Sequence, residues 1–308
     1  MTSERTAQAV EAAAAAGREL GLEVTEPTVL YDVFSVVVHL KPSPVVARVP
    51  VVLPGALRDP AKAGVRQQRE LEVAQWVFDQ GELVVRPSPL VPLRSVQRDG
   101  LSMSFWEYVE HDKSTEPDYV QGLVRAAELH KLLESYPGAL PWFAPVTAVV
   151  PEGLEQLGPD TPLLTAADVD RVRREWDAVA PVLTTREGWE RAFPGSHVQP
   201  LHGDAPYYNI IPTADGVLWS DFEDVCLGPL EWDLASVGPE FSKVYNDAAA
   251  ELGRPQLDQK AVAAMDLARA FQLIICLPLL PQMPAGMAET LEPFVANWRE
   301  MPFANDVV

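Results

Sequence analysis

The sequence is short of cysteine, of basic residues relative to acidic ones, and of long hydrophobic runs, and each shortage excludes a class of protein. Only Cys226 and Cys276 occur, which excludes a disulfide framework and a cysteine-based zinc site and fits a reducing compartment. Lys and Arg number 24 against 44 Asp and Glu, for a formal net charge of −20. This balance argues against a nucleic-acid partner, because binding to a phosphate backbone requires a basic surface.

The hydrophobic segments argue against a membrane protein. The most apolar run of the later sequence, residues 271–280, is shorter than the roughly 20 residues that span a bilayer, and it contains Pro278. The first residues hold an alanine run, but Glu11 and Glu19 interrupt it and no basic leader precedes it, so they predict a surface helix rather than a signal peptide. We therefore expect a cytoplasmic protein. Its 308 residues, 47% of them hydrophobic, are enough for more than one lobe with a buried core.

The most informative segment lies between residues 201 and 235. His202, Asp204 and Asn209 form the pattern H-x-D-x-x-x-x-N, and Asp221 opens a D-F-E triplet. Between the two motifs, residues 214–216 predict a hairpin turn joining two short strands. We expect this hairpin to fold Asn209 and Asp221 back towards each other.

These residue types suit the transfer of a γ-phosphoryl group, which requires positioning and charge neutralisation more than covalent chemistry by the protein. Asp204 is the candidate that orients a hydroxyl and accepts its proton, and Asn209 and Asp221 are candidate oxygen ligands of Mg²⁺. His202 is expected to brace the loop. A single D-x-x-x-x-N arises by chance, but chance does not readily explain a second acidic motif, a hairpin between the two and Asp233 beyond them.

The segment resembles the aminoglycoside phosphotransferase and choline kinase branch of kinase-like enzymes in three places: HGDAPYYN, SDFED and LEWDLA. Protein kinases usually have Arg where this chain has Gly203, D-F-G where it has Glu223, and a downstream A-P-E that it lacks. The resemblance therefore implies a small-molecule substrate rather than a protein. It also implies that Asp233 supports the catalytic loop from below, as a structural residue.

The resemblance implies an α+β, protein-kinase-like fold, with a small N-terminal antiparallel β lobe and a larger, mainly helical C-terminal lobe. Alternating and β-branched apolar residues predict strands at 22–29, 34–40 and 45–52. We expect the nucleotide-binding β lobe with its leading helix over 1–103, a hinge over 104–110, and the catalytic and acceptor-binding lobe over 111–308. Helical periodicity predicts helices at 67–77, from 119 onward, and at 165–192, 239–252 and 257–277.

Nucleotide contacts in the β lobe are assigned by the same resemblance. The third strand of such enzymes carries a basic residue, usually Lys, that contacts the phosphates, and Arg48 occupies that place. Glu70, with Glu72 as second candidate, matches the helix glutamate that pairs with it. The first turn has no glycine, and Ser35 is the candidate hydroxyl donor there. A solvated strand arginine and an ordinary strand serine stay open as alternatives.

The hinge is expected to receive the nucleobase. Phe105, Trp106 and Glu107 would then be neighbours of adenine, with backbone amide and carbonyl groups making the polar contacts. Trp106 as plain packing is the open alternative.

The function that these observations imply is an ATP-dependent, Mg²⁺-requiring phosphotransferase acting on a small-molecule hydroxyl. The candidate acceptors are an aminoglycoside, another amino-sugar or amino-alcohol, or a neutral sugar, and GTP stays open as a donor. The negative charge permits a cationic acceptor, and four residues could line an acidic site unless they form a solvated helix face: Glu231, Glu240, Asp247 and Glu251. The alternative function is a catalytically weak, kinase-like nucleotide sensor or scaffold, which Arg48 and the glycine-free turn favour. Nothing in the sequence indicates the oligomeric state.

Overall fold

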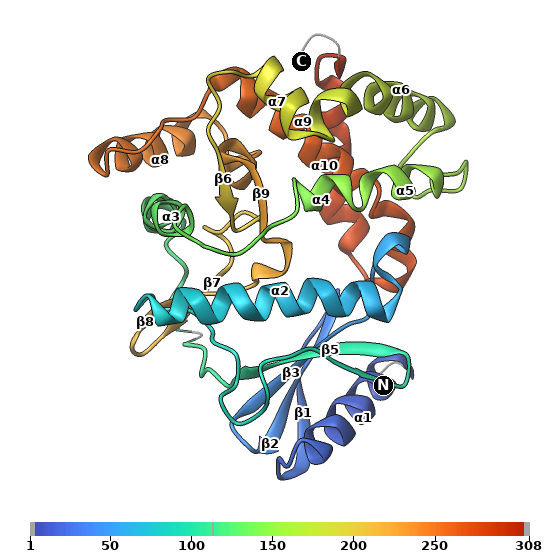
Figure 1. Ribbon diagram of the computed structural model, residues 1–308. Coiled ribbons are helices and arrows are strands. Elements are labelled where there is room, and N and C mark those ends of the chain that lie inside the picture. Colours follow the sequence, from blue (N-terminus) through green and yellow to red (C-terminus); the bar gives the residue numbers. More distant parts are fainter. Residues whose placement is uncertain (1–3, 113, 305–308) are drawn as a thin grey trace. The chain divides into compact units, whose positions relative to one another are not determined.

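The structure, a computed structural model, describes residues 4–112 and 114–304, which form two compact units (Figure 1). The sheet unit contains the chain up to Leu53, Leu57–Glu116 and Ile211–Glu223. The helical unit contains Pro54–Ala56, Pro117–Ile210 and the chain from Asp224 onward. A sheet unit and a helical unit together make the predicted α+β architecture.

The sheet unit is built on a five-stranded antiparallel sheet with the order β1-β2-β3-β5-β4. Its strands are β1 (Val24–Asp32), β2 (Ser35–Pro42), β3 (Val45–Pro50), β4 (Val96–Arg98) and β5 (Leu101–Glu107). The three predicted N-terminal strands are therefore confirmed. β3 lies between β2 and β5, and Arg48 on β3 is paired with Val37 on one side and Ser104 on the other.

The two faces of this sheet have different partners because successive side chains of a strand point to opposite faces. Ala47 and Val49 of β3 belong to a core cluster with the alanines of α1 (Glu4–Glu19), so the predicted N-terminal helix covers one face. Val46 and Arg48 point to the other face. There α2 (Pro60–Asp79), capped at its N-terminus by the Asp59 side chain, contacts β4 and β5.

The predicted hairpin is present. β7 (Ile210–Thr213) pairs with β8 (Gly216–Trp219), and the hydroxyl of Thr213 donates to the carbonyl oxygen of Gly216 at 2.7 Å across the turn. The 3₁₀ turn η2 (Phe222–Asp224) follows directly.

The helical unit combines most of the helices with one two-stranded sheet. The longer helices are α3 (Tyr119–Leu133), α6 (Ala166–Leu183), α8 (Pro239–Glu251), α9 (Gln259–Ile274) and α10 (Met287–Glu300). The shorter ones are α4 (Ala144–Thr147), α5 (Val150–Glu155), α7 (Arg186–Ala192) and the 3₁₀ turns η3 (Leu230–Leu234) and η4 (Leu277–Gln282), while η1 (Gly55–Leu57) lies at the unit boundary. β6 (Val198–Leu201) pairs with β9 (Cys226–Pro229). α6 starts where the sequence predicts, at a capping box formed by Thr165 and Asp168.

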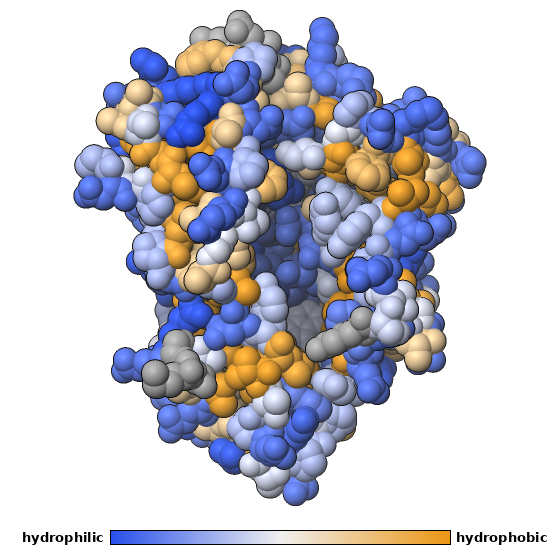
Figure 2. Space-filling view, turned by 180° about the vertical axis from the view of Figure 1, so that it is seen from behind, coloured by the Kyte–Doolittle hydropathy of each residue, from blue (hydrophilic) through white to orange (hydrophobic). Residues whose placement is uncertain are grey.

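The surface drawn in Figure 2 is mostly hydrophilic, with separate hydrophobic patches between the polar regions. Among the described residues, no helix combines the length and the apolar character that a membrane crossing needs.

Candidate active site

Three carboxylates surround Arg48 in the sheet unit. Its guanidinium lies 2.9 Å from Oε1 of Glu70 on α2, 2.8 Å from Oδ1 of Asp221, which follows β8, and 2.8 Å from Oε2 of Glu223. Arg66 of α2 also binds Glu223, at 3.2 Å. The hairpin of β7 and β8 thus returns the D-F-E triplet to the face of the sheet that carries Arg48.

Burial and charge shift the pKa values in this cluster. Burial raises the pKa of the Glu70 carboxyl to about 8, although the neighbouring Arg48 acts in the opposite direction. Burial also acts to raise the pKa of Glu223, but Arg48 and Arg66 outweigh it and hold that pKa below its ordinary value. The second oxygen of Glu70, Oε2, is buried and makes no hydrogen bond within the described residues. The cluster therefore has three carboxylates against the two arginines Arg48 and Arg66.

A cavity of about 240 Å³ opens beside this cluster within the sheet unit. Arg48, Glu70 and Asp221 line it together with Trp106 and Glu107 of β5. Apolar side chains complete the wall, including Leu30, Val37, Val46, Val85 and Phe222. A pocket with apolar walls and a basic group at one end suits a nucleotide, whose base is flat and whose phosphates are anionic.

The remaining predicted nucleotide residues lie away from that cavity. Phe105 alternates with Trp106 along β5, so its side chain points to the opposite face and packs in the α1 core cluster. Ser35 is buried at the start of β2, opposite Pro50, and does not line the cavity. Residues 104–107 of the expected hinge continue β5, because they pair with β3.

Asp233 holds the loop of the helical unit that contains His202, Gly203 and Asp204. This fully buried carboxylate accepts hydrogen bonds from the backbone N–H of His202 at 2.9 Å and of Gly203 at 2.8 Å. The ring nitrogen Nε2 of His130 lies 2.9 Å from the same carboxylate. Burial opposes its charge, but these hydrogen bonds hold the pKa of Asp233 below its ordinary value. Trp232 adds a hydrogen bond from its indole N–H to the carbonyl oxygen of Gly203 at 2.6 Å.

Asp204 leaves this loop with its side chain 41% exposed. Its carboxylate lies 2.9 Å from Nη1 of Arg269 on α9. The side-chain amide of Asn209 donates to the backbone carbonyl oxygen of Asp204 at 2.5 Å and lies 3.4 Å from Oδ2 of the carboxylate. The H-x-D-x-x-x-x-N spacing thus joins Asp204 and Asn209 within one loop.

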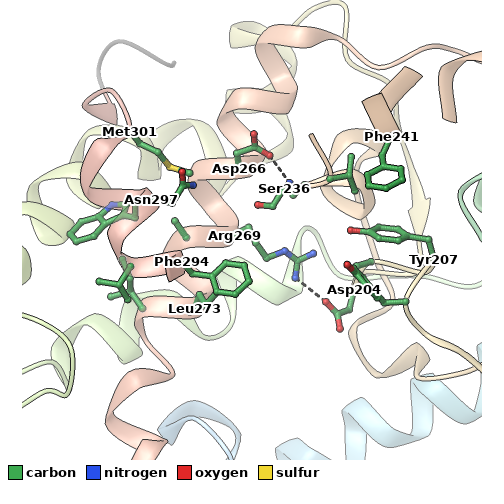
Figure 3. Close-up of a pocket in the computed structure, with 18 of the residues that line it drawn as sticks. Asp204, Tyr207, Ser236, Phe241, Asp266, Arg269, Leu273, Phe294, Asn297 and Met301 are labelled. Carbon is green, nitrogen blue, oxygen red and sulfur yellow. Dashed lines mark hydrogen bonds and ion pairs between the residues drawn. The ribbon is translucent and has the colours of Figure 1, made fainter. Parts of the chain in front are cut away.

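A cavity of about 540 Å³ in the helical unit has Asp204 in its wall (Figure 3). Aromatic side chains dominate the lining: Tyr119, Tyr207, Tyr208, Phe241, Phe294 and Trp298. Asp266 and Arg269 enter from α9, where the carboxylate of Asp266 accepts the backbone N–H of Ser236 at 2.7 Å. The volume lies within the range of about 300–1,000 Å³ that is typical of small-ligand sites.

Solved structures of small-molecule kinases share this architecture over nearly the whole chain. The chain aligns with the choline kinase LicA from Streptococcus pneumoniae at 13% identity, covering 92% of this chain and 98% of that chain, with a TM-score of 0.59. It aligns with the amicoumacin kinase hAmiN in complex with AMP-PNP, Ca²⁺ and Ami at 12% identity, covering 97% of each chain, with a TM-score of 0.61. The fold is that of the choline kinase and aminoglycoside phosphotransferase structures. The resemblance inferred from the motifs is thereby confirmed for the fold.

This kinase-like fold also aligns with the streptomycin-ATP-APH(2")-IIa ternary complex at 14% identity, covering 96% of this chain and 98% of that chain, with a TM-score of 0.54. No family model matches the chain, and no curated protein matches its sequence. At identities this low, the structural alignments show the kinase-like fold. They do not show an activity.

The two predicted ligands of Mg²⁺ belong to different units, Asn209 to the helical unit and Asp221 to the sheet unit. The nitrogen of the Asn209 amide is used on Asp204, so the atom with which Asn209 would bind a cation is its carbonyl oxygen, and Asp221 offers a carboxylate. Amide and carboxylate oxygens are both of the hard type that Mg²⁺ prefers. Among the described residues, no group of three or more His, Cys, Asp or Glu could hold a metal without such outside ligands.

Three charged residues of these sites were missed in the sequence: Glu223, Asp266 and Arg269. From the sequence alone, Glu223 is treated only as a departure from D-F-G. The acidic third residue of the triplet is the signal that indicates a partner for a basic residue such as Arg48. Asp266 and Arg269 share the cavity face of α9, as residues three apart on a helix do, and polar residues on an otherwise apolar helix stripe were visible in the sequence.

The four acidic residues suggested for an acceptor site do not line the cavity. Glu231 is buried and accepts hydrogen bonds from the hydroxyl of Ser196 at 2.7 Å and the backbone N–H of Asp258 at 2.9 Å, so it holds the unit together. Glu240, Asp247 and Glu251 are exposed on α8.

Proposed function

We propose that the protein transfers the γ-phosphoryl group of ATP to a hydroxyl of a small molecule. The observation that carries the proposal is the position of Asp204. Its carboxylate stands in the wall of a largely apolar cavity of about 540 Å³, on a loop fixed by buried Asp233. A partly exposed carboxylate on a rigid loop beside an apolar cavity suits a group that must meet an organic hydroxyl.

In this proposal Asp204 orients the acceptor hydroxyl and takes its proton. The hydroxyl oxygen forms a bond to the γ-phosphorus, the bond from that phosphorus to the β–γ bridging oxygen breaks, and ADP leaves with the electron pair. Arg48 contacts the phosphates, and the backbone of a hinge over 104–110 receives the base next to Trp106 and Glu107. Asn209 and Asp221 would hold Mg²⁺, which neutralises phosphate charge when it is bound.

The solved relatives support this choice of donor and cation. One of these structures is a complex with ATP and another is a complex with AMP-PNP and Ca²⁺, so ATP with a divalent cation is the first combination to test, and GTP is the second. The neighbouring structures are named for choline, for streptomycin and for amicoumacin, which are three different small molecules. The acceptor class is therefore a small hydroxyl compound, with aminoglycosides, amino-sugars, amino-alcohols and neutral sugars all as candidates, met in the cytoplasm.

A thermal-shift titration tests the nucleotide site. Binding to the folded state alone raises the melting temperature, so MgATP or MgGTP at millimolar concentration should shift the unfolding curve. No shift with either nucleotide overturns the proposal. Product mass after incubation with an acceptor panel then tests the reaction, because phosphorylation adds one phosphoryl group to the acceptor.

A sensor or scaffold is the second candidate, and the arrangement around Arg48 favours it. With its guanidinium bound by Glu70, Asp221 and Glu223, Arg48 has carboxylates where a catalytic site would need phosphate. Tight binding of ATP without phosphorylation of any acceptor would select this candidate.

A further inference from the structure

Arg269 places a fixed positive charge in the wall of the cavity that contains Asp204. Besides its contact with Asp204, the guanidinium lies 2.7 Å from Oε1 of Gln272 and 3.8 Å from the centre of the Trp232 ring. The side chain is only 16% exposed. Two polar partners and one aromatic ring therefore hold the guanidinium at the cavity wall.

The cavity has little negative charge left to bind a cation. Asp204, Asp266 and Arg269 are its only Asp, Glu, Lys, Arg or His linings among the described residues. Arg269 balances Asp204, which leaves Asp266 as the single uncompensated carboxylate. Burial raises the pKa of Asp266 above its ordinary value.

Apart from Ser236, Asn297 and the hydroxyl groups of three tyrosines, the rest of the wall is apolar. Its apolar residues include Phe294, Val295 and Trp298 of α10 and Leu273 and Ile274 of α9, and Figure 3 shows Arg269 reaching from α9 towards Asp204. Apolar surface of this kind favours the transfer of apolar groups out of water and penalises charged groups that lose their hydration without gaining partners.

We propose that the acceptor is a hydroxyl compound with an apolar, uncharged body, and that Arg269 selects against ammonium groups next to the reacting hydroxyl. The proposal rests on the proposed function, since it takes Asp204 as the group that meets the hydroxyl. An aminoglycoside would bring several ammonium groups to a cavity that offers one free carboxylate, and would place some of them beside a guanidinium. Like charges placed together in a desolvated site oppose binding.

The net charge of −20 permits a cationic acceptor, but the residues that line the cavity favour a neutral one. A negative surface attracts cations over long distances, but salt screens that attraction within about 10 Å at ordinary ionic strength. Selection happens at the contacts inside the cavity, where Arg269 lies.

Calorimetric titration of the full chain with a matched pair of probes tests the proposal. The probes are 3-phenyl-1-propanol and L-phenylalaninol, which differ by one ammonium group on the carbon next to the carbinol, with kanamycin as the polycation. For the parent protein we expect the neutral alcohol to bind at least about fivefold more tightly than phenylalaninol, and kanamycin to show no binding at about 10 mM. Tighter or equal binding of either cation overturns the proposal.

Variants of Arg269 show whether its charge is the cause. Arg269→Gln should bring the two probes to within about twofold of each other, whereas Arg269→Lys keeps the charge and should keep the preference. Arg191→Gln, which removes an exposed arginine of α7 that does not line the cavity, is the matched control and should behave as the parent. An unchanged preference in a folded Arg269→Gln protein overturns the role of Arg269. If Arg269→Gln does not fold, the Arg269→Lys variant decides: loss of the preference for the neutral alcohol in that variant overturns the role of the charge of Arg269.

These titrations contain no nucleotide, so their failure is distinguishable from failure of the proposed function. A protein that binds MgATP but does not bind the neutral alcohol at about 10 mM contradicts the acceptor class alone. A protein that prefers the neutral alcohol but ignores nucleotides contradicts the phosphotransferase and leaves the selectivity of the cavity standing.

Discussion

Gly203 and Asp224 touch through their backbones. A Cβ atom added to Gly203 would lie 1.9 Å from the carbonyl oxygen of Asp224. Gly203 also has a φ of +93°, a conformation that residues with a side chain rarely adopt. The position where protein kinases carry arginine therefore admits only glycine in this loop, and the glycine of H-G-D is a packing requirement.

Gly203→Ala should accordingly destabilise the helical unit and displace the backbone next to Asp204. We expect the free energy of unfolding to fall by about 2 kcal/mol or more, since steric overlap adds to backbone strain. Urea unfolding measures the change. Gly253→Ala is the control, because Gly253 has a φ of +67° but nothing within 4 Å of an added Cβ, and strain alone costs about 1 kcal/mol. Equal losses in the two variants would show that the contact with Asp224 is not tight.

Arg48→Lys tests whether the fork of a guanidinium is needed in the sheet unit. Arg48 uses two guanidinium nitrogens to bind Glu70, Asp221 and Glu223. The ammonium group of a lysine has a single nitrogen and cannot reproduce these contacts. We expect a loss of about 1–3 kcal/mol of stability, because buried carboxylates lose their partner. A thermal melt without nucleotide shows it. An equally stable Lys variant would mean that the cluster is dispensable for folding.

The parts of the fold that the sequence predicted well are those specified locally. Alternation over residues 22–52 predicted three strands, and the turn residues 214–216 predicted the hairpin of β7 and β8, since both signals depend on neighbours within a few positions. The support of the loop by Asp233 was assigned from the family motif, and the structure places its carboxylate against the backbone of His202 and Gly203.

The features that the sequence did not predict depend on contacts between distant residues. Arg269 follows Asp204 by 65 positions, and no periodicity in α9 indicates that its guanidinium turns towards the catalytic loop. Phe105 was expected beside the base because it lies in the segment assigned to the hinge. The face of a strand on which a residue lies depends on register, and the register of β5 is set by its pairing with β3.

Glu70 predicts a specific dependence of stability on pH. The pKa of the Glu70 carboxyl is about 8 in the folded protein, and its ordinary value, which applies to the unfolded chain, is 4.5. Between these two pH values the folded state therefore binds one more proton at Glu70 than the unfolded state does. The free energy of unfolding should therefore fall as the pH rises from about 5 to 8, by at most about 1.4 kcal/mol per pH unit from this group. Glu70→Gln cannot titrate and should lack this decline.

Urea unfolding of both proteins between about pH 5 and pH 9 measures the difference. Glu72→Gln, an exposed substitution on the same helix, is the control and should keep the decline of the parent. Parallel curves for the parent and the Glu70 variant would show that Glu70 stays ionised beside Arg48.

The two motifs of the catalytic segment should separate in their effects on binding and turnover. Asp204→Asn preserves the shape of the side chain but removes the proton acceptor, so turnover should fall by about 10²–10⁴-fold while the affinity for MgATP stays close to that of the parent. Asp221→Ala removes a proposed ligand of Mg²⁺ and should weaken the binding of MgATP itself. Calorimetric titration with MgATP and steady-state turnover of an accepted substrate provide the two measurements.

Asp215→Asn is the matched control for this pair, because Asp215 is an exposed carboxylate in the turn between β7 and β8. It should change neither measurement. If the Asp204 and Asp221 variants lose nucleotide binding and turnover in the same proportion, the two residues do not have separate roles. Parental activity in both folded variants would remove the catalytic assignment. Each variant lacks one proposed group, the hydroxyl-orienting carboxylate or a metal ligand, and a phosphotransferase that uses these groups cannot lose either one without losing activity.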